Sequence, residues 1–344
     1  MVSPSNEAAW LTSKGSPLEV RPAPYTVPGD HELVIQNFAL AINPADWVQQ
    51  AYEPYPLQFP TILGHDTAGI VHKVGSLVTR FRIGDRVVGH GCGMTSKRDC
   101  DSTFQKYTVV PDNMVSHLPA SVSFEAASVI PLGLSTASCG LYQKDFLALQ
   151  YPSVPPRSSI GQVLVVWAGS TSVGSNAIQL AVASGYEVFT TASPKNFDYV
   201  KKLGASQVFD YNSTNVVDDL VEALKEKGVV GAMDCISVKG SIELCGEVLS
   251  KCNSEGGKMI STVLGPAEGG LPGGVKSKRI WGGSLMNNEV GKIVYEDFLP
   301  QALETGTFIP APEYEVVGSG LGSIQLGLDT LKKGVSAKKI VITL

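Results

Sequence analysis

A short loop between Gly169 and Gly174 directly follows a strand-like apolar run and precedes a helix-like one. Between the two glycines lie small side chains, most of them hydroxyl-bearing, which are Ser170, Thr171, Ser172 and Val173. Such loops bind phosphate groups, because glycine lets the backbone approach closely and the N-terminus of the next helix attracts an anion. A nucleoside-triphosphate loop needs a lysine directly after its second glycine, whereas Ser175 and Asn176 follow Gly174. The loop therefore predicts a dinucleotide site, although the middle glycine of G-x-G-x-x-G is missing.

The end of the next strand-like run indicates which dinucleotide is bound. In sites selective for NAD, an Asp or Glu at this point accepts a hydrogen bond from the ribose 2′-hydroxyl. The run YEVFTTASPKN instead ends in Ser193, Pro194, Lys195 and Asn196, which would also suit a turn that caps a helix. A lysine and two hydrogen-bonding side chains attract a 2′-phosphate, which a carboxylate would repel. We therefore expect NADPH as the cofactor. Tyr211, after the third strand, would suit a place beside its adenosine end and would equally suit an ordinary surface or core position.

The composition limits the class of protein. The chain has 344 residues, 43% of them hydrophobic and 17% charged, with a net charge of -5, which suggests two domains with a core each. Mild acidity without a block of Lys or Arg argues against a nucleic-acid surface. The N-terminal residues do not resemble a secretory signal, and the apolar runs are shorter than the roughly 20 residues of a membrane span. The six cysteines form no CxxC pair. We therefore expect a cytoplasmic protein with reduced thiols and no nucleic-acid or membrane partner.

The pattern of apolar runs changes near residue 126. Residues 1–125 contain short strand-like runs separated by Pro and Gly, such as HELVIQNFAL, and predict a β-rich domain. Over residues 126–295, strand-like runs such as GQVLVVWAG and GKMISTV alternate with helix-like runs such as NAIQLAVASG. This alternation predicts an α/β domain with a parallel sheet covered by helices on both faces. The tail, residues 296–344, returns to a mixed pattern and ends in the strand-like run KKIVITL.

Several stretches together resemble the medium-chain dehydrogenase/reductase superfamily. They occur in the family's order along essentially the whole chain and are INPADW (42–47), ILGHDTAGIVHKVG (62–75), FRIGDRVVG (81–89), IPLGLSTA (130–137), WAGSTSVG (167–174), KKLGASQVFDY (201–211) and KKGVSAKKIVI (332–342). The chain is most similar to the zinc-free branch, especially fungal trans-acting enoyl reductases and quinone-oxidoreductase-like proteins. The resemblance implies a GroES-like substrate domain (1–125, completed by 296–344), a Rossmann doubly wound domain (126–295) and an active site in the cleft.

His65 lies where zinc-dependent members of the superfamily place a metal-binding histidine. Their cysteine ligand falls near Asp46 and their third ligand near Leu132, so neither position holds a cysteine. Tetrahedral zinc needs three or four converging ligands. The family's structural zinc lobe also lacks its four cysteines, because Cys92 and Cys100 stand alone. We therefore expect no metal and expect His65 to make structural hydrogen bonds.

The resemblance implies further NADPH contacts outside the glycine loop. In the zinc-free branch they correspond to Ser193 to Asn196 and Tyr211, and also to Val263, Leu264, Ser336 and Ala337. Taken alone, Val263 and Leu264 would equally suit core positions at a strand end. The lysines beside Ser336 would equally suit a solvated face.

Without a zinc ion to act as Lewis acid, the natural chemistry is hydride transfer from NADPH to an activated C=C bond or a quinone. The expected cleft residues, none of which is singled out as the proton donor, are Asn43, Asp46, Trp47, His65, Leu132, Ser135 and Thr136. Ser135 and Thr136 are predicted to open a helix and could act only as caps.

We expect an enoyl reductase of secondary metabolism that acts on a polyketide or related carrier-bound intermediate, with a polyketide synthase as a partner in trans. The chain would be a monomer or a homodimer. Two alternatives stay open, a reductase of quinones or α,β-unsaturated ketones and a catalytically silent NADPH-binding accessory protein. Val48 stands where reductases of the trans-acting type commonly carry a lysine, and this departure weakens the enoyl thioester assignment.

Overall fold

The computed structural model describes residues 4–238, 240–252 and 258–344, and the chain divides into two compact units. Unit 1 comprises Met1–Leu132, Leu285–Glu304 and Pro310–Leu344, and unit 2 comprises Gly133–Ser284 and Thr305–Ile309. These bounds differ from the expected ones at residues 125 and 295. Residues 126–132 stay with unit 1 because helix α3 (Phe124–Ser128) packs on its sheet and Leu132 bonds to Asp66. Residues 285–295 join it through bonds such as Tyr295 Oη to the Pro131 carbonyl.

Unit 1 is built on a seven-stranded sheet. Its strands are, in spatial order, β15 (Glu313–Ser319), β16 (Lys338–Thr343), β3 (Glu32–Ala41), β5 (Asp66–Val74), β6 (Arg86–His90) and β8 (Val115–His117), with β7 (Tyr107–Pro111) also paired to β3. All neighbours are antiparallel except the pair β15 and β16, which is parallel. Because β16 pairs with β3, the last strand of the chain completes a sheet that begins near the N-terminus.

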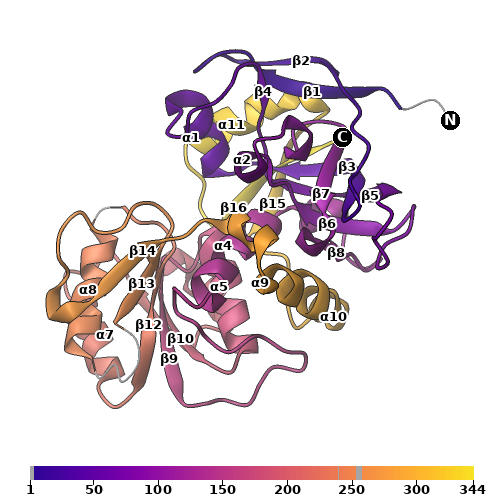
Figure 1. The fold of residues 1–344 in the computed structure, drawn as a ribbon. Helices are drawn as coiled ribbons and strands as arrows, with labels where there is room; N and C mark the ends of the chain where they lie inside the picture. Colours follow the sequence, from indigo (N-terminus) through magenta and orange to yellow (C-terminus); the bar gives the residue numbers. More distant parts are fainter. Residues whose placement is uncertain (1–3, 239, 253–257) are drawn as a thin grey trace. The chain divides into compact units, whose positions relative to one another are not determined.

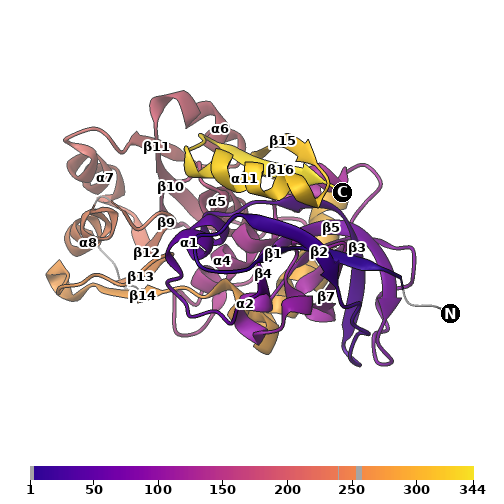
Figure 2. The same cartoon turned by 90° about the horizontal axis from the view of Figure 1, so that it is seen from above.

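A smaller sheet and several helices complete unit 1. The sheet has the order β2 (Leu18–Ala23), β1 (Asn6–Leu11) and β4 (Thr61–Ile62). The helices are α1 (Pro44–Tyr52), α2 (Gly93–Ser96), α3, α9 (Glu289–Lys292), most of α10 (Leu299–Thr305) and α11 (Ile324–Lys332). Helix α11 lies along β15 and β16, as Figure 2 shows in yellow. Its buried residues Ile324 and Leu328 join an apolar cluster with Leu40 and Ile342 of the large sheet.

Unit 2 has the predicted parallel sheet. The six strands are, in spatial order, β11 (Gln207–Asp210), β10 (Glu187–Ala192), β9 (Gln162–Trp167), β12 (Gly228–Asp234), β13 (Met259–Thr262) and β14 (Lys276–Arg279). Every pair is parallel. Strand order reverses between β9 and its neighbours β10 and β12, which is the arrangement of doubly wound dinucleotide-binding folds. The fold prediction for this region is confirmed.

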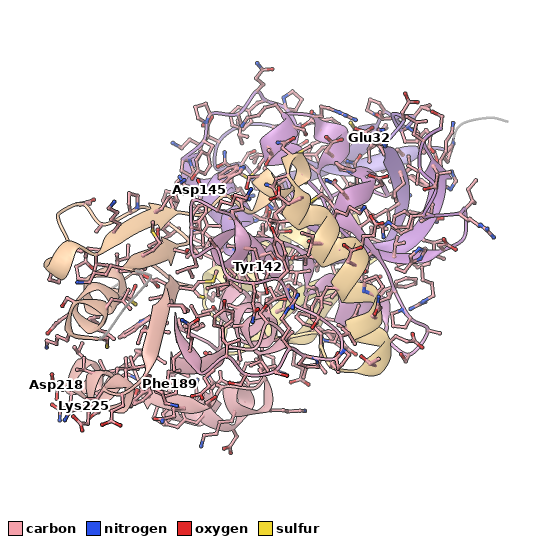
Figure 3. The ribbon with its side chains drawn as sticks, turned by 60° about the horizontal axis from the view of Figure 1, so that its bottom comes forward. Glu32, Tyr142, Asp145, Phe189, Asp218 and Lys225 are labelled. Atoms are coloured by element: carbon pink, nitrogen blue, oxygen red, sulfur yellow. The ribbon has the colours of Figure 1, made fainter. Side chains whose placement is uncertain are left out.

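Helices cover both faces of the unit 2 sheet. They are α5 (Ser172–Ala183), α6 (Phe197–Lys202), α7 (Val216–Leu224), α8 (Ser241–Lys251) and the part of α4 (Pro131–Tyr142) from Gly133 onward. Figure 1 shows α7 and α8 on one side of the strands and α5 on the other. Both faces of the central strand are therefore buried, which explains why VLVVW in β9 is continuously apolar. Phe189 is buried in this core, whereas Asp218 and Lys225 have exposed side chains and lie at the lower left edge of the molecule in Figure 3.

One helical stretch is apolar and long enough to be compared with a membrane span. Phe124–Tyr142 has 19 residues, and 72% of its most apolar window is buried inside the structure. The sequence analysis had found only strand-length apolar runs, so this stretch is longer than expected. A buried stretch of this kind is typical of the core helices of globular proteins.

Candidate cofactor and active-site residues

The glycine loop of unit 2 joins β9 to α5 at the carboxyl end of the sheet. Ala168 has a φ of 63°, a left-handed conformation that turns the chain sharply after the strand. Thr171 stands where the middle glycine of the dinucleotide motif would be, and it is the N-cap of α5. Its Oγ1 donates to the Ala168 carbonyl at 2.9 Å and accepts from the Gly174 N–H at 3.1 Å. At the position where the motif has a glycine, Thr171 therefore holds the loop with hydrogen bonds of its side chain.

Gly169 and Gly174 allow close packing in this loop. A Cβ on Gly169 would lie 2.2 Å from Thr190 Oγ1, and a Cβ on Gly174 would lie 2.4 Å from the Ala168 carbonyl oxygen. Neither position can accept a side chain without displacing its neighbours. The packing of α5 on the sheet therefore depends on both glycines.

The first turn of α5 offers two backbone donors for a ligand. Within the described residues, the N–H groups of Ser172 and Val173 have no protein acceptor. Such groups are unpaired because a helix has no preceding turn to accept their bonds. The helix dipole adds a partial positive charge at this end. The loop can therefore bind an anionic phosphate group.

Ser193, Pro194, Lys195 and Asn196 follow β10 beside this loop. The segment Pro194–Asn196 forms one 3-10 turn directly before α6. Asn196 Nδ2 donates to Ser193 Oγ at 3.2 Å and to Ser170 Oγ at 3.4 Å, so the two loops are connected. Lys195 is exposed and forms no ion pair among the described residues. Its ammonium is thus available for a ligand.

Tyr199 on α6 contacts the glycine loop through Ser175. Its hydroxyl lies 2.7 Å from Ser175 Oγ, which also donates to the Gly169 carbonyl at 3.4 Å. Burial raises the pKa of Tyr199 to about 12, although the bond to Ser175 opposes this rise. Tyr199 therefore stays neutral and couples α6 to the first turn of α5. The sequence analysis did not identify it.

The remaining predicted cofactor residues lie at different levels of exposure. Tyr211 is 42% exposed and Leu264 is 51% exposed, so the core interpretation of Leu264 is wrong. Val263 is half-buried, and its N–H bonds to Asp234 and Ser237. Ser336 and Ala337 belong to unit 1, where they form a bend before β16, with Ser336 exposed and Ala337 half-buried. Their contacts with a cofactor stay a prediction.

A buried ionic network in unit 1 joins several of the predicted cleft residues. Asp66 is fully buried at the start of β5. Its Oδ1 accepts from the Leu132 N–H at 2.6 Å, and its Oδ2 accepts from Asn43 Nδ2 at 2.8 Å. The Lys339 ammonium lies 3.0 Å from the same Oδ2 and donates to Asn43 Oδ1. Lys339 is 2% exposed, so the solvated-face interpretation of this lysine is wrong.

Asp46 and His65 form a second buried pair in unit 1. The Asp46 Oδ1 lies 2.9 Å from His65 Nδ1, and Oδ2 accepts from the Asn43 N–H at 2.8 Å. Burial alone would lower the pKa of His65, but the charge and hydrogen bond of Asp46 raise it above its ordinary value. The His90 ring lies 6.0 Å from that of His65, and burial followed by repulsion from His65 lowers the pKa of His90 to about 3. His65 therefore makes the structural bond that was expected.

Trp47 and Val48 follow Asp46 on α1 and are half-buried. Val48 provides no cation at this place. Instead, the Lys332 ammonium from α11 lies 5.9 Å from the centroid of the Trp47 ring, and Tyr52 packs against the ring edge. A cation is thus present beside Trp47, although the sequence pattern did not indicate it.

Ser135 and Thr136 do not cap a helix. Helix α4 begins at Pro131, so both residues lie within it, and Ser135 is fully buried. The expectation that they open the helix is wrong, because Pro131 suits the first helical position and starts it earlier. Both belong to unit 2, whereas the other predicted cleft residues, including Leu132, belong to unit 1.

Comparisons with known proteins agree with this architecture. Residues 29–120 match the alcohol dehydrogenase GroES-like domain, and residues 172–280 match the zinc-binding dehydrogenase family. The chain is 50% identical to the zinc-binding alcohol dehydrogenase domain-containing protein cipB of Emericella nidulans, over 99% of this chain and 98% of that protein. It is 41% identical to the trans-enoyl reductase himH of Aspergillus japonicus, over 99% and 98%. A crystal structure of an alcohol dehydrogenase superfamily protein from Novosphingobium aromaticivorans matches with a TM-score of 0.80 and 26% identity, over 98% and 99%.

The family description raises the question whether the unit 1 network fits zinc. Zinc needs three or four ligand atoms that converge on one point. His65 Nδ1 is bonded to Asp46, both oxygens of Asp66 are bonded within the protein, and the Leu132 side chain has no donor. Among residues 4–238, 240–252 and 258–344, no three His, Cys, Asp or Glu side chains are placed to hold a metal ion. The donor set therefore does not fit a catalytic zinc.

Proposed function

Because the chain belongs to the medium-chain dehydrogenase/reductase superfamily of oxidoreductases, whose fold implies a nicotinamide cofactor, we propose that it is a zinc-independent, NADPH-dependent reductase of activated C=C bonds. The observation that supports NADPH most directly is the end of β10. There Ser193, Lys195 and Asn196 lie beside the glycine loop, and no carboxylate occupies the turn. A 2′-phosphate would find a cation and polar donors there.

The described residues suggest how the cofactor is held. The N–H groups of Ser172 and Val173 would bind the pyrophosphate at the N-terminus of α5. The Lys195 ammonium would pair with the 2′-phosphate, and Asn196 holds Ser170 and Ser193 in place. When bound, the reduced nicotinamide supplies a hydride for the β-carbon of the substrate. Tyr199 keeps the loop in position through Ser175.

The substrate carbonyl must accommodate the negative charge that develops after hydride transfer. Zinc does not serve this role in our proposal, because the unit 1 donors are already bonded to one another. The Asp46–His65 pair holds a proton at Nδ1 of His65, where Asp46 orients the ring. Asp46 and His65 thus hold the His65 ring and the start of α1 in a fixed position, and the charge of Asp46 is compensated by the His65 proton.

A named relative supports the proposed substrate class. The protein of Aspergillus japonicus is named a trans-enoyl reductase, and the chain aligns with it over nearly its full length. We propose an enoyl thioester of a polyketide or related intermediate, presented by a synthase that acts in trans. A second candidate is the reduction of quinones or α,β-unsaturated ketones. It is favoured by Val48, which stands where reductases of the trans-acting type commonly carry a lysine. The 5.9 Å approach of Lys332 to Trp47 favours the first candidate.

The test is stopped-flow oxidation of NADPH against three acceptors, a crotonyl thioester, a quinone and a simple enone. Turnover of the thioester alone supports the enoyl reductase, and broad turnover of quinones supports the second candidate. NADPH binding without turnover of any acceptor would indicate an accessory protein and contradict the proposal. A chelator is added in parallel, and loss of activity together with about one zinc per chain by elemental analysis would contradict zinc independence.

A further inference from the structure

Unit 1 contains a lysine in a place where lysines are seldom found. The side chain of Lys339 is 3% exposed and that of Asp66 is 0% exposed, and the two charged atoms lie 3.0 Å apart. Removing two charges from water is costly unless they are paired and their remaining hydrogen-bonding atoms are satisfied. Here the two charges are paired, both Asp66 oxygens accept hydrogen bonds, and the ammonium also donates to Asn43 Oδ1. Neither the fold prediction nor the proposed hydride transfer requires this pair.

The lysine and the aspartate lie at the meeting point of four chain segments. Asn43 at the start of α1 accepts from Lys339 through Oδ1 and donates to Asp66 Oδ2 through Nδ2 at 2.8 Å. Asp66 Oδ1 accepts from the Leu132 N–H in the first turn of α4 at 2.6 Å. The ammonium therefore fixes the orientation of the Asn43 amide and, through Asp66, the start of α4.

The surrounding charged groups leave Lys339 as the main counter-ion of Asp66. Asp46 is bonded to His65, which lies next to Asp66 in the sequence, and Leu132 provides only its backbone N–H. His90 is adjacent on β6 and is neutral, because burial lowers its pKa to about 3. Two carboxylates, two imidazoles and one ammonium are thus buried together in this part of unit 1.

We propose that Lys339 is an internal counter-ion that occupies the place of a metal cation at Asp66, excludes such a cation, and positions Asn43 and the start of α4. Carboxylates beside an imidazole would otherwise attract a divalent cation. The ammonium supplies the compensating charge permanently from the protein itself. Lys339 is a positioning residue in this scheme and touches no reacting atom.

The first experiment measures metal binding. Lys339→Met preserves the length of the side chain and removes its charge, and Lys338→Met changes the neighbouring exposed lysine, which pairs with Glu313. We titrate both variants and the unchanged protein with Co²⁺ and follow visible absorption. Lys339→Met is expected to bind Co²⁺ at least about tenfold more tightly than the other two proteins. Equal binding by all three folded proteins would overturn the proposal.

The second experiment remains informative if Lys339→Met does not fold. A cycle of Lys339→Met, Asp66→Asn and the double variant is measured by thermal unfolding. Each single change leaves a buried charge or polar group without its partner, and we expect each to lower the melting temperature by at least about 5 °C. The double variant should recover at least half of the loss. A double variant that is as unstable as the sum of the single changes, or that fails to fold, would overturn the proposal.

Neither measurement uses a substrate or a nicotinamide cofactor. Failure of the acceptor assays would therefore contradict the proposed function and leave this inference untouched. Conversely, equal Co²⁺ binding would overturn the role of Lys339 without affecting the assignment of the cofactor loop. The two proposals can thus fail separately.

Discussion

The ionic network of unit 1 and the glycine loop of unit 2 satisfy their polar groups in opposite ways. In unit 1, Asp66 and Asp46 are fully used by protein partners, and Lys339 supplies the balancing charge. In unit 2, within the described part of the chain, the Ser172 and Val173 N–H groups have no protein acceptor and the exposed Lys195 ammonium forms no ion pair. The first region is complete without a ligand, whereas the second is completed by one.

The difference indicates where binding energy can come from. Groups that are already paired cannot gain from a ligand, but they hold neighbouring atoms in fixed positions. Groups that are left unpaired at a helix N-terminus gain charge-assisted hydrogen bonds when an anion arrives. Substitutions in the two regions should therefore affect different quantities, stability in unit 1 and cofactor affinity in unit 2.

The largest expected effect is on stability in the network. Asp46→Ala removes the acceptor of His65 and of the Asn43 N–H and leaves both groups buried without it. We expect the free energy of unfolding to fall by about 3–5 kcal/mol, measured by denaturant titration. Ser170→Ala in the glycine loop is the matched control and should change it by less than about 0.5 kcal/mol. Equal losses for the two variants would contradict the division of roles.

Lys195→Ala should change affinity instead. Loss of a charge-assisted contact with the 2′-phosphate is expected to weaken NADPH binding by about 1.5–3 kcal/mol, or roughly 10- to 150-fold in Kd. Binding of NADH and the melting temperature of the unliganded protein should stay unchanged. Calorimetric titration with both dinucleotides checks this. If Kd for NADPH does not change, Lys195 does not recognise the 2′-phosphate.

The network should also make the protein sensitive to acid. The pKa of His90 is about 3 in the folded protein and about 6.5 in the unfolded chain. Between these two pH values, His90 is protonated in the unfolded chain and neutral in the folded protein. The contribution of neutral His90 to the free energy of unfolding is complete above pH 6.5. As the pH falls from 6.5 toward 3, the free energy of unfolding decreases by about 1.4 kcal/mol per pH unit. His90→Gln should reduce this slope between pH 6.5 and 5, and the exposed His31→Gln serves as control. Identical slopes for all three proteins would show that His90 does not titrate in this way.

The smallest effect tests whether the open loop has internal support. Tyr199→Phe removes the bond to Ser175 and should lower stability by about 1 kcal/mol. A slightly mobile loop should also weaken NADPH binding severalfold. Tyr314→Phe, at an exposed position of β15 in unit 1, is the control for loss of a tyrosine hydroxyl. If NADPH affinity is the same for both variants, Ser175 does not need Tyr199 to position the loop.

The alternation of apolar runs and helix-like segments predicted the parallel sheet because both signals are local. The run VLVVW and the segment NAIQLAVASG indicate a strand and a helix from their own residues, and β9 and α5 follow. The positions of Gly169 and Gly174 were predictable for the same reason. The start of α4 at Pro131 was not predicted, because hydroxyl side chains such as Ser135 and Thr136 favour helix N-caps, whereas Pro131 also suits the first helical position.

The network was beyond prediction because its pairs are distant in the sequence. In KKIVITL the lysines Lys338 and Lys339 look alike, yet one pairs with Glu313 at the surface and the other is buried. Strand alternation places them on opposite faces, but it does not show which face is covered. That information lies in Asp66 and Asn43, which no local pattern connects to the last strand.

Synthesis of the chain gives the late position of Lys339 a further consequence. Asn43 leaves the ribosome 296 residues before the lysine that bonds to it. At about 5–20 residues per second, this interval lasts roughly 15–60 s. During that time the nascent N-terminal strands lack both the ammonium and the strand that seals β3, so Asp66 must stay hydrated or protonated. The sheet and the ionic network of unit 1 can therefore be completed only after β16 has been synthesised.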